Sequence, residues 1–291
     1  MEIAKNPDLP GVIEITGSSD GPRAVIFAGV HGDEVSGIHA IDKLLFDFFG
    51  GERTLTRGTL TLARGNAHAI AAERRYVRYN LNRMYKDDYD QEIDRDAYEF
   101  KRAQQLKAIL RTCDYFFDFH SAPIAQEAFL VAEGKSVNFF SKLGLPKIIS
   151  GWSKFSSGPT GGDGETYAST HGAIAATLES GSHFEKRSND IAYSAAISFL
   201  SALNMLEKGV EQGPTDIEIF QMYAVVTKDA DDFRYTPEVK NFQHIKKGDA
   251  FAFQNGAPLT VAEDTYLLIP MTPEKTKVHE EVCYLGRKLA R

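Results

Sequence analysis

Cysteine is scarce in this sequence, and this excludes one large class of metal site. Only Cys113 and Cys283 occur, far apart along the chain. A zinc site built on thiolates needs several clustered cysteines, so no such site is expected. Any metal must therefore be held by histidine and carboxylate side chains, and both thiols are expected to be reduced.

Long apolar runs and an excess of positive charge are also missing. No uncharged apolar stretch is long enough to cross a bilayer, and the formal net charge is −7. An acidic chain is poorly suited to nucleic acid or an anionic membrane as its main partner. The opening MEIAKNPDLPG has no apolar core of a secretory signal, so a cytoplasmic location is expected. A homo-oligomer is compatible with the sequence.

What the chain does contain is an alternation of strand and helix patterns. Strand-like segments occur at 11–17, 23–30, 58–67, 114–120 and 173–180. Apolar residues recur at helical spacing in 34–49, 96–112 and 189–209. This alternation predicts an α/β fold with a mixed, mostly parallel central sheet flanked by helices.

The character of the sequence changes after Lys208. The segment 209–216, GVEQGPTD, is typical of a linker, and the rest is strand-like with turn signals such as Asn255-Gly256. We therefore predict a catalytic domain over residues 1–208 and a small β-rich domain over residues 209–291.

Polar side chains follow three of the predicted core strands. The strand VIFAGV leads to His31, with Glu34 soon after it on the first turn of the predicted helix. YFFDFH ends in His120, and AIAATLE ends in Glu179. In open α/β sheets the ligand crevice lies outside the carboxyl ends of the strands. We expect these four side chains to meet there.

Two imidazoles and one carboxylate form a ligand set that zinc uses in hydrolases. His31, Glu34 and His120 would hold one Zn²⁺ per chain and leave a position open for water. Zinc at such a site lowers the pKa of its water to roughly 7. Glu179 would be the spare carboxylate and act as a general base.

Each of these residues also has a plainer interpretation. Glu34 could favour the positive end of its helix, His120 could be a satisfied core histidine, and Glu179 a salt-bridge partner. Asp118, two residues before His120 on the same strand face, is either an acceptor that orients His120 or a backbone partner. The joint placement at three strand ends favours the metal site.

Two further segments are expected to border the crevice. In RRYVRYNLNRMY, residues 74–85, Arg83 offers the planar fork suited to a carboxylate and Asn82 a further donor. We predict that this pair binds a substrate anion, the alternative being a solvated basic face. The glycine-rich stretch 158–166 lacks the context of a phosphate loop and is expected to be a loop near the site.

The motifs GVHGDE, NLNR, DFHS and TLESG, in this order, resemble the succinylglutamate desuccinylase/aspartoacylase family, relatives of the zinc carboxypeptidases. The resemblance extends from about Val25 to Leu206, and the appended β-rich domain suits the family. It implies a zinc-carboxypeptidase-like fold, zinc bound by the three residues named above, and Glu179 as the general base. It further implies that Asn82 and Arg83 bind a substrate carboxylate and that Arg75 polarises the scissile carbonyl.

Two positions depart from the family pattern. Asn80 stands where the family commonly has aspartate. This difference is expected to change how the substrate-binding pair Asn82 and Arg83 is held in place. An arginine that aspartoacylases use for the second substrate carboxylate would fall near Ser169. N-acetylaspartate is therefore not the expected substrate.

The leading hypothesis is a zinc-dependent amidohydrolase that removes a small acyl group from an N-acyl amino acid. One rival keeps the metal but acts on peptides as a carboxypeptidase. Another is a non-catalytic binding module, which the presence of Glu179 disfavours.

Overall fold

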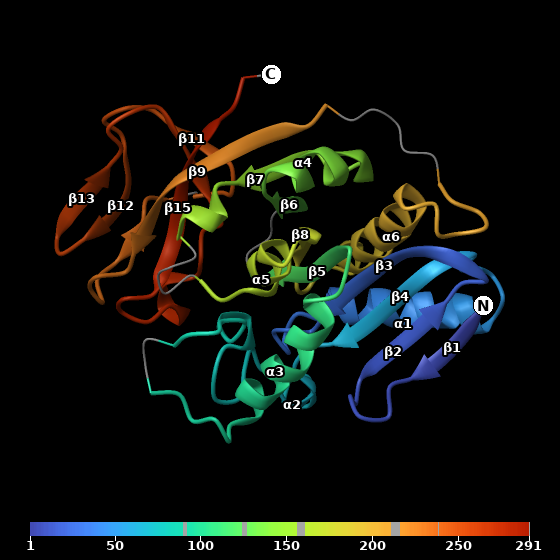
Figure 1. Ribbon diagram of the computed structural model, residues 1–291. Coiled ribbons are helices and arrows are strands. Elements are labelled where there is room, and N and C mark those ends of the chain that lie inside the picture. The colour runs from blue at the N-terminus through green and yellow to red at the C-terminus, as the bar shows by residue number, and fades with distance from the viewer. Residues whose placement is uncertain (90–91, 124–126, 156–160, 211–215, 238, 291) are drawn as a thin grey trace.

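A 12-stranded sheet runs through the protein, and a separate 3-stranded sheet lies near one end (Figure 1). The computed structural model describes residues 1–89, 92–123, 127–155, 161–210, 216–237 and 239–290. In the large sheet the strand order is β1-β2-β4-β3-β5-β8-β6-β7-β9-β15-β14-β11, and in the small one β10-β12-β13.

The strands of the amino-terminal half of the large sheet are β1 (Glu2–Lys5), β2 (Val12–Thr16), β3 (Ser19–Ala28), β4 (Arg57–Arg64), β5 (Tyr115–Ala122), β6 (Phe129–Ala132), β7 (Lys147–Ser150) and β8 (Ile174–Ser182). The later strands are β9 (Glu218–Thr227), β10 (Arg234–Tyr235), β11 (Gln243–Ile245), β12 (Ala250–Gln254), β13 (Ala257–Thr260), β14 (Thr265–Leu268) and β15 (Glu281–Lys288). Strands β4, β3, β5 and β8 are mutually parallel, whereas β6 runs antiparallel to β8.

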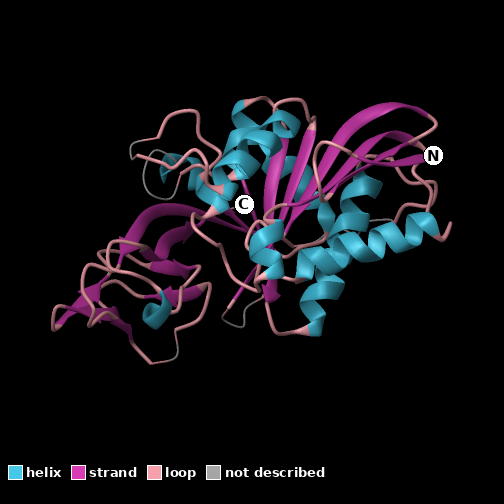
Figure 2. Cartoon of the chain, turned by 90° about the horizontal axis from the view of Figure 1, so that it is seen from below, coloured by secondary structure: helices cyan, strands magenta, loops and turns pink. Residues whose placement is uncertain are grey.

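Helices lie on both sides of the sheet (Figure 2). They are α1 (Ser36–Phe49), α2 (Ala67–Ala71), α3 (Tyr98–Leu110), α4 (Lys135–Phe140), α5 (Gly164–Thr170) and α6 (Lys186–Ala202), with 3-10 helices η1 (Leu81–Arg83), η2 (Ser141–Leu143), η3 (Trp152–Phe155) and η4 (Pro273–Lys275). Two hydrophobic clusters pack against the sheet, one with α1 and α6 and the other with α3 and α5. Ile26 of β3 belongs to the first cluster, whereas its neighbours Val25 and Phe27 belong to the second. This alternation explains why the central strands are apolar on both faces.

The predicted fold class is confirmed, because the sheet is mixed, contains the parallel run β4-β3-β5-β8 and is flanked by helices. Beyond residue 216 the regular elements of the described chain are the strands β9 to β15 and the short η4, and Asn255-Gly256 forms the turn between β12 and β13, with φ of 53° and 69°. Strand β9 pairs in parallel with β7, so the carboxyl-terminal strands continue the central sheet. The division at residue 208 stays a prediction, and residues 211–215 of the expected linker lie outside the described residues.

Among the described helices, none is both long enough and apolar enough to cross a membrane.

Gly37 lies where α1 crosses the sheet. A Cβ atom at this position would lie 2.6 Å from Cβ of Phe119 and 2.9 Å from Cβ of Ala28. Glycine inside a helix costs about 1 kcal/mol relative to alanine, so this close approach explains its presence. Because Phe119 precedes His120 on β5, the contact sets how closely α1 packs on a site-bearing strand.

We expect Gly37→Ala to lower the free energy of unfolding by about 1–3 kcal/mol, because the added methyl group overlaps Phe119 and Ala28. Equilibrium urea denaturation measures the change. The control is His39→Ala at an exposed position of the same helix, which should shift stability by less than about 0.5 kcal/mol. A Gly37→Ala protein as stable as the wild type would contradict this packing.

Candidate active site

The turn between β3 and α1 carries His31 and Glu34. Glu34 precedes α1 by two residues, so the predicted placement of Glu34 on the first helical turn is wrong. The reason is a tight turn whose Gly32 lies against the backbone of Ala69: an added Cβ would come within 2.1 Å of the Ala69 carbonyl carbon. Its backbone N–H donates to the carbonyl of Arg75 at 3.3 Å. The turn is thereby held between two neighbouring segments.

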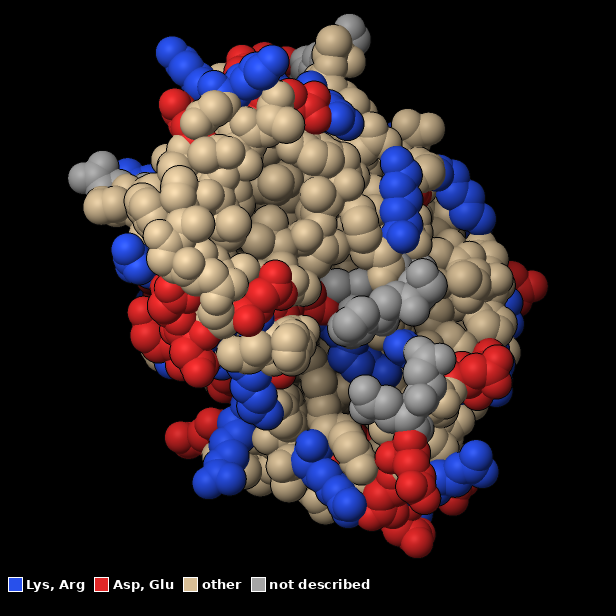
Figure 3. Space-filling model, turned by 90° about the vertical axis from the view of Figure 1, so that its left-hand side faces the viewer, with Lys and Arg blue, Asp and Glu red and all other residues tan. Residues whose placement is uncertain are grey.

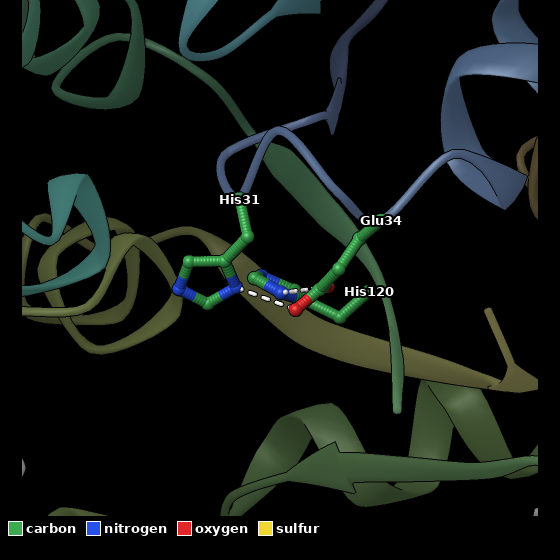
Figure 4. Close-up of side chains that lie close together, drawn as sticks. All are labelled: His31, Glu34 and His120. Carbon is green, nitrogen blue, oxygen red and sulfur yellow. Dashed lines mark hydrogen bonds and ion pairs between the residues drawn. The ribbon is translucent and has the colours of Figure 1, made fainter. Parts of the chain in front are cut away.

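His31, Glu34 and His120 point toward one another (Figure 4). His31 Nδ1 lies 2.7 Å from Glu34 Oε1, and His120 Nδ1 lies 2.9 Å from Glu34 Oε2. All three are buried, and one ligand atom from each falls within 4.8 Å of the others, so this group could hold a metal ion. A second group, made of Asp33, Glu34 and His183, also converges, but Asp33 and His183 are only partly buried.

The outer ring nitrogen of each histidine faces an oxygen. His31 Nε2 lies 3.0 Å from Asn80 Oδ1 in a hydrogen bond, whereas His120 Nε2 lies 3.0 Å from Asp118 Oδ2 as an ion pair without hydrogen-bond geometry. Metal-binding histidines usually direct their second nitrogen at such an acceptor, which fixes the ring and leaves the other nitrogen for the ion. The residues therefore fit a metal. Asn80 fills this position on His31 with an amide oxygen, which also accepts the backbone N–H of Asn82 at 2.9 Å.

Burial and charge act in opposite directions on the central carboxylate and its partners. Burial alone would raise the pKa of Glu34, but the two imidazoles hold that pKa well below its usual value. Burial, with the positive charge of Arg75, lowers the pKa of His31 to about 3. Burial would also lower the pKa of His120, yet the carboxylates of Asp118 and Glu34 raise it well above the usual value. Glu34 is therefore held as a carboxylate.

Glu179 lies directly beside His120, since these two residues are partners in the parallel register of β5 and β8. Both are inside their strands, which continue to Ala122 and Ser182. Glu179 lines the same pocket as His31, and its buried Oε2 atom has no hydrogen-bond partner in the described part of the chain. Burial, reinforced by the negative charge of Glu34, raises the pKa of Glu179 to about 8.

Arg75, Asn82 and Arg83 line this pocket too, as expected for residues that meet a substrate. Arg75 Nη1 donates to Glu34 Oε1 at 3.0 Å. Asn82 and Arg83 belong to η1, and Arg83 Nη2 lies 3.8 Å from Glu281 Oε1 of β15. All seven predicted site residues are thus in one pocket.

Several further residues line the pocket that were not among the predicted site residues, although the stretch 158–166 was expected near the site. Asp163 and Glu165, from the glycine-rich stretch, line the pocket, and so do Ile269, Met271 and Tyr284 from the carboxyl-terminal part. In that stretch, residues 158–160 lie outside the described residues and 164–166 form the first turn of α5. Figure 3 shows a face with a recess that has Lys or Arg atoms inside it and acidic side chains on both sides.

Glu99 of α3 anchors the segment that follows Arg75. Its side chain is 1% exposed, and Oε1 accepts the backbone N–H groups of Val77 at 2.9 Å and Arg78 at 3.1 Å. Burial would raise the pKa of Glu99, but these backbone hydrogen bonds lower it below its usual value. The carboxylate thus holds the segment that leads to η1.

A family model for the succinylglutamate desuccinylase/aspartoacylase catalytic domain matches residues 20–203. The chain belongs to this family. The match covers more than half of the chain and confirms the resemblance drawn from the motifs. It also confirms the expectation of an enzyme of the hydrolase class.

Curated relatives and solved structures agree with this assignment. The succinylglutamate desuccinylase of Pseudoalteromonas atlantica is 24% identical over 275 residues, covering 85% of this chain and 76% of that protein. That of Erwinia tasmaniensis is 27% identical over 263 residues, covering 83% and 78%. The crystal structure of succinylglutamate desuccinylase from Vibrio cholerae superimposes with a TM-score of 0.78 at 19% identity, covering 96% of this chain and 85% of that one. This likeness shows a shared fold.

We expect Glu99→Gln to lower the free energy of unfolding by about 1–2 kcal/mol at pH 7, because charged acceptors bind N–H groups more strongly than an amide does. The pKa of Glu99 is lowered on folding, so its contribution is full above the unfolded value of 4.5 and is lost as pH falls through the folded value. Urea denaturation from pH 3 to pH 7 measures this, with exposed Glu52→Gln as the control. A stability difference that does not change with pH would contradict a charged Glu99.

Proposed function

We propose that this protein is a zinc-dependent amidohydrolase that removes a small acyl group from an N-acyl amino acid. One observation carries the proposal: the buried set His31, Glu34 and His120 shares a pocket with the carboxylate of Glu179, whose Oε2 atom has no partner in the described chain. Ligands and a spare base side by side are the minimum that hydrolysis at a metal site requires.

His31, Glu34 and His120 would hold the zinc ion through His31 Nδ1, His120 Nδ1 and the Glu34 carboxylate, the atoms that converge. When bound, zinc supplies a Lewis acid that lowers the pKa of water, polarises a carbonyl oxygen and favours the ionised form of Glu179. The set of two histidines and one carboxylate is typical of zinc hydrolases with an open position.

The remaining residues perform the proton transfer and the positioning. Glu179 accepts a proton from the attacking water and returns it to the nitrogen of the leaving amine. Arg75, which is held by Glu34 at 3.0 Å, donates to the carbonyl oxygen as negative charge develops there. Arg83 and Asn82 bind the carboxylate of the amino acid and so orient the amide.

The carboxyl-terminal part supports a small substrate over a peptide. Ile269, Met271 and Tyr284, all from this part, form part of the pocket wall and so reduce the space open to a substrate larger than an acyl amino acid. The curated relatives are named for succinylglutamate, an N-acyl amino acid. Both observations favour an N-acyl amino acid as the substrate.

We expect the purified protein to contain one zinc ion per chain and His31→Ala to bind zinc more weakly. Loss of a direct ligand should exceed the roughly 10–100-fold cost of losing an outer partner. Competition with a chromophoric chelator measures the affinity, and mass spectrometry measures the metal content. His39→Ala, an exposed histidine of α1, should retain zinc. Wild-type protein without stoichiometric zinc would count against the proposal.

We expect Glu179→Gln to lower kcat for N-acyl amino acids by about 10²–10⁴-fold, because the amide cannot accept the proton of water. KM and zinc content should change little, since Glu179 is not among the proposed ligands. Steady-state hydrolysis of N-acetyl, N-succinyl and N-formyl amino acids, with Glu52→Gln as the matched control, measures both constants. An unchanged kcat would rule out Glu179 as the base.

A further inference from the structure

Two buried carboxylates line the pocket in addition to Glu34 and Glu179. Glu165 is 4% exposed and Asp163 is 5% exposed, and both belong to the start of α5. Acidic side chains are seldom buried this deeply unless a positive charge or a metal accompanies them. A positively charged group is therefore expected near Glu165 and Asp163.

The described residues supply only neutral hydrogen-bond partners to these two groups. Thr177 Oγ1 donates to Glu165 Oε2 at 3.0 Å. Asp163 accepts the backbone N–H of Thr166 at 2.7 Å and the indole N–H of Trp152 at 3.3 Å. In the described ranges, neither carboxylate has a Lys, Arg or His nitrogen within 4.0 Å. Outside those ranges, Arg291 is the one basic residue of the sequence.

Ionisation of the buried Glu165 carboxyl group is unfavourable in this pocket. Burial, reinforced by the neighbouring charge of Asp163, raises the pKa of Glu165 well above its usual value, although the Thr177 hydroxyl acts in the opposite direction. Glu133 and Asp118 add further negative charge nearby. A bound cation would offset this cost, because opposite charge favours the ionised form.

Both carboxylates are adjacent to the proposed machinery. Thr177 lies two residues before Glu179 on β8, so the two side chains point to the same face of the sheet. The backbone N–H of Gly164, between the two acidic residues in sequence, donates to Asn82 Oδ1 at 3.3 Å. A group that reaches Glu165 is therefore close to both the base and the carboxylate-binding segment.

The pocket has no spare cation for a second substrate carboxylate. Arg75 and Arg83 are the Lys or Arg residues among its described lining, and they already lie 3.0 Å from Glu34 and 3.8 Å from Glu281. Ser169, one turn after Glu165 on α5, is not part of that lining. The start of α5 thus presents carboxylates to the pocket, and their negative charge disfavours a second substrate carboxylate beside them.

A further observation indicates that the pocket receives a polar ligand. The hydroxyl of Tyr284 is buried, lines the pocket and has no hydrogen-bond partner in the described part of the chain. Buried polar atoms in native proteins are nearly always paired. A ligand with polar groups at several points would pair it together with Glu179 Oε2.

We propose that the substrate is an N-acyl amino acid that carries a primary ammonium group, which pairs with Glu165 and Asp163 while its carboxylate binds Arg83 and Asn82. This inference rests on the proposed deacylase function and narrows its substrate class. The ammonium group belongs either to the side chain of the amino acid or to the acyl group. In both cases a positive charge lies beside Glu165.

The test uses pairs of substrates that differ only in that group. Nα-acetyl-L-ornithine is compared with Nα-acetyl-L-norleucine, in which a methyl group replaces the amine, and N-(β-alanyl)-L-alanine with N-butanoyl-L-alanine. Nα-acetyl-L-glutamate represents the dicarboxylates. For the zinc-loaded wild type we expect kcat/KM to be about 10–100-fold higher for one ammonium substrate than for its neutral partner, and lowest for the glutamate.

Glu165→Gln should reduce the ratio of kcat/KM within the preferred pair by about 10-fold or more, whereas Glu52→Gln, at an exposed position, should leave the ratio unchanged. A neutral or acidic substrate that is cleaved as well as the ammonium substrates would overturn the substrate class and leave the deacylase function standing. Because the wild-type comparison needs no variant, a poorly folded Glu165→Gln protein does not affect this outcome.

A binding measurement tests the ammonium site independently of the deacylase activity. If no N-acyl amino acid is hydrolysed, the deacylase proposal fails, and calorimetry then compares L-ornithine with L-norleucine and β-alanine with butanoate on the same protein. Tighter binding of one amine, weakened in Glu165→Gln, supports an ammonium site. Equal binding within both pairs overturns it.

Discussion

The structure of the site depends on the carboxylate of Glu34, which is buried between two histidines. One oxygen faces His31 and Arg75, and the other faces His120 and the backbone N–H of Ser121. This single side chain therefore joins the turn after β3, the strand β5 and the segment that carries Arg75. Its negative charge is tolerated because both of its oxygens face donors or potential cations, although Glu179 and Asp33 lie near it.

The parallel register of the central strands places the other groups around Glu34. The pairing of β5 with β8 sets His120 opposite Glu179, and the pairing of β3 with β5 brings the turn of His31 to the same edge. The side-chain alternation of β8 then aligns Thr177 with Glu179 and so brings Glu165 of α5 into the pocket. Strand register thus places the proposed metal ligands and base beside one another, whereas the short helix α5 contributes the negative charge of the pocket wall.

The parts of the site that lie on regular elements are predictable from sequence patterns. The strands that carry His120 and Glu179, and the turn of His31, follow apolar segments that predict buried strands. Helical spacing that begins at Glu34 predicts a helix there, but the contact of Gly32 with Ala69 imposes a turn instead. That contact joins residues far apart along the chain, so no local pattern could indicate it.

The sequence by itself determined the α/β class, the family and the residues with metal-binding chemistry, because periodicity and motifs are local properties. Only the tertiary structure decided that Asn80 and Asp118 face the outer nitrogens of His31 and His120. It also decided that Tyr284 lines the pocket and that Glu165 faces it with no Lys, Arg or His nitrogen of the described ranges within 4.0 Å. These facts depend on which distant segments pack together, and the free energy of that packing comes from the whole core and not from any single stretch.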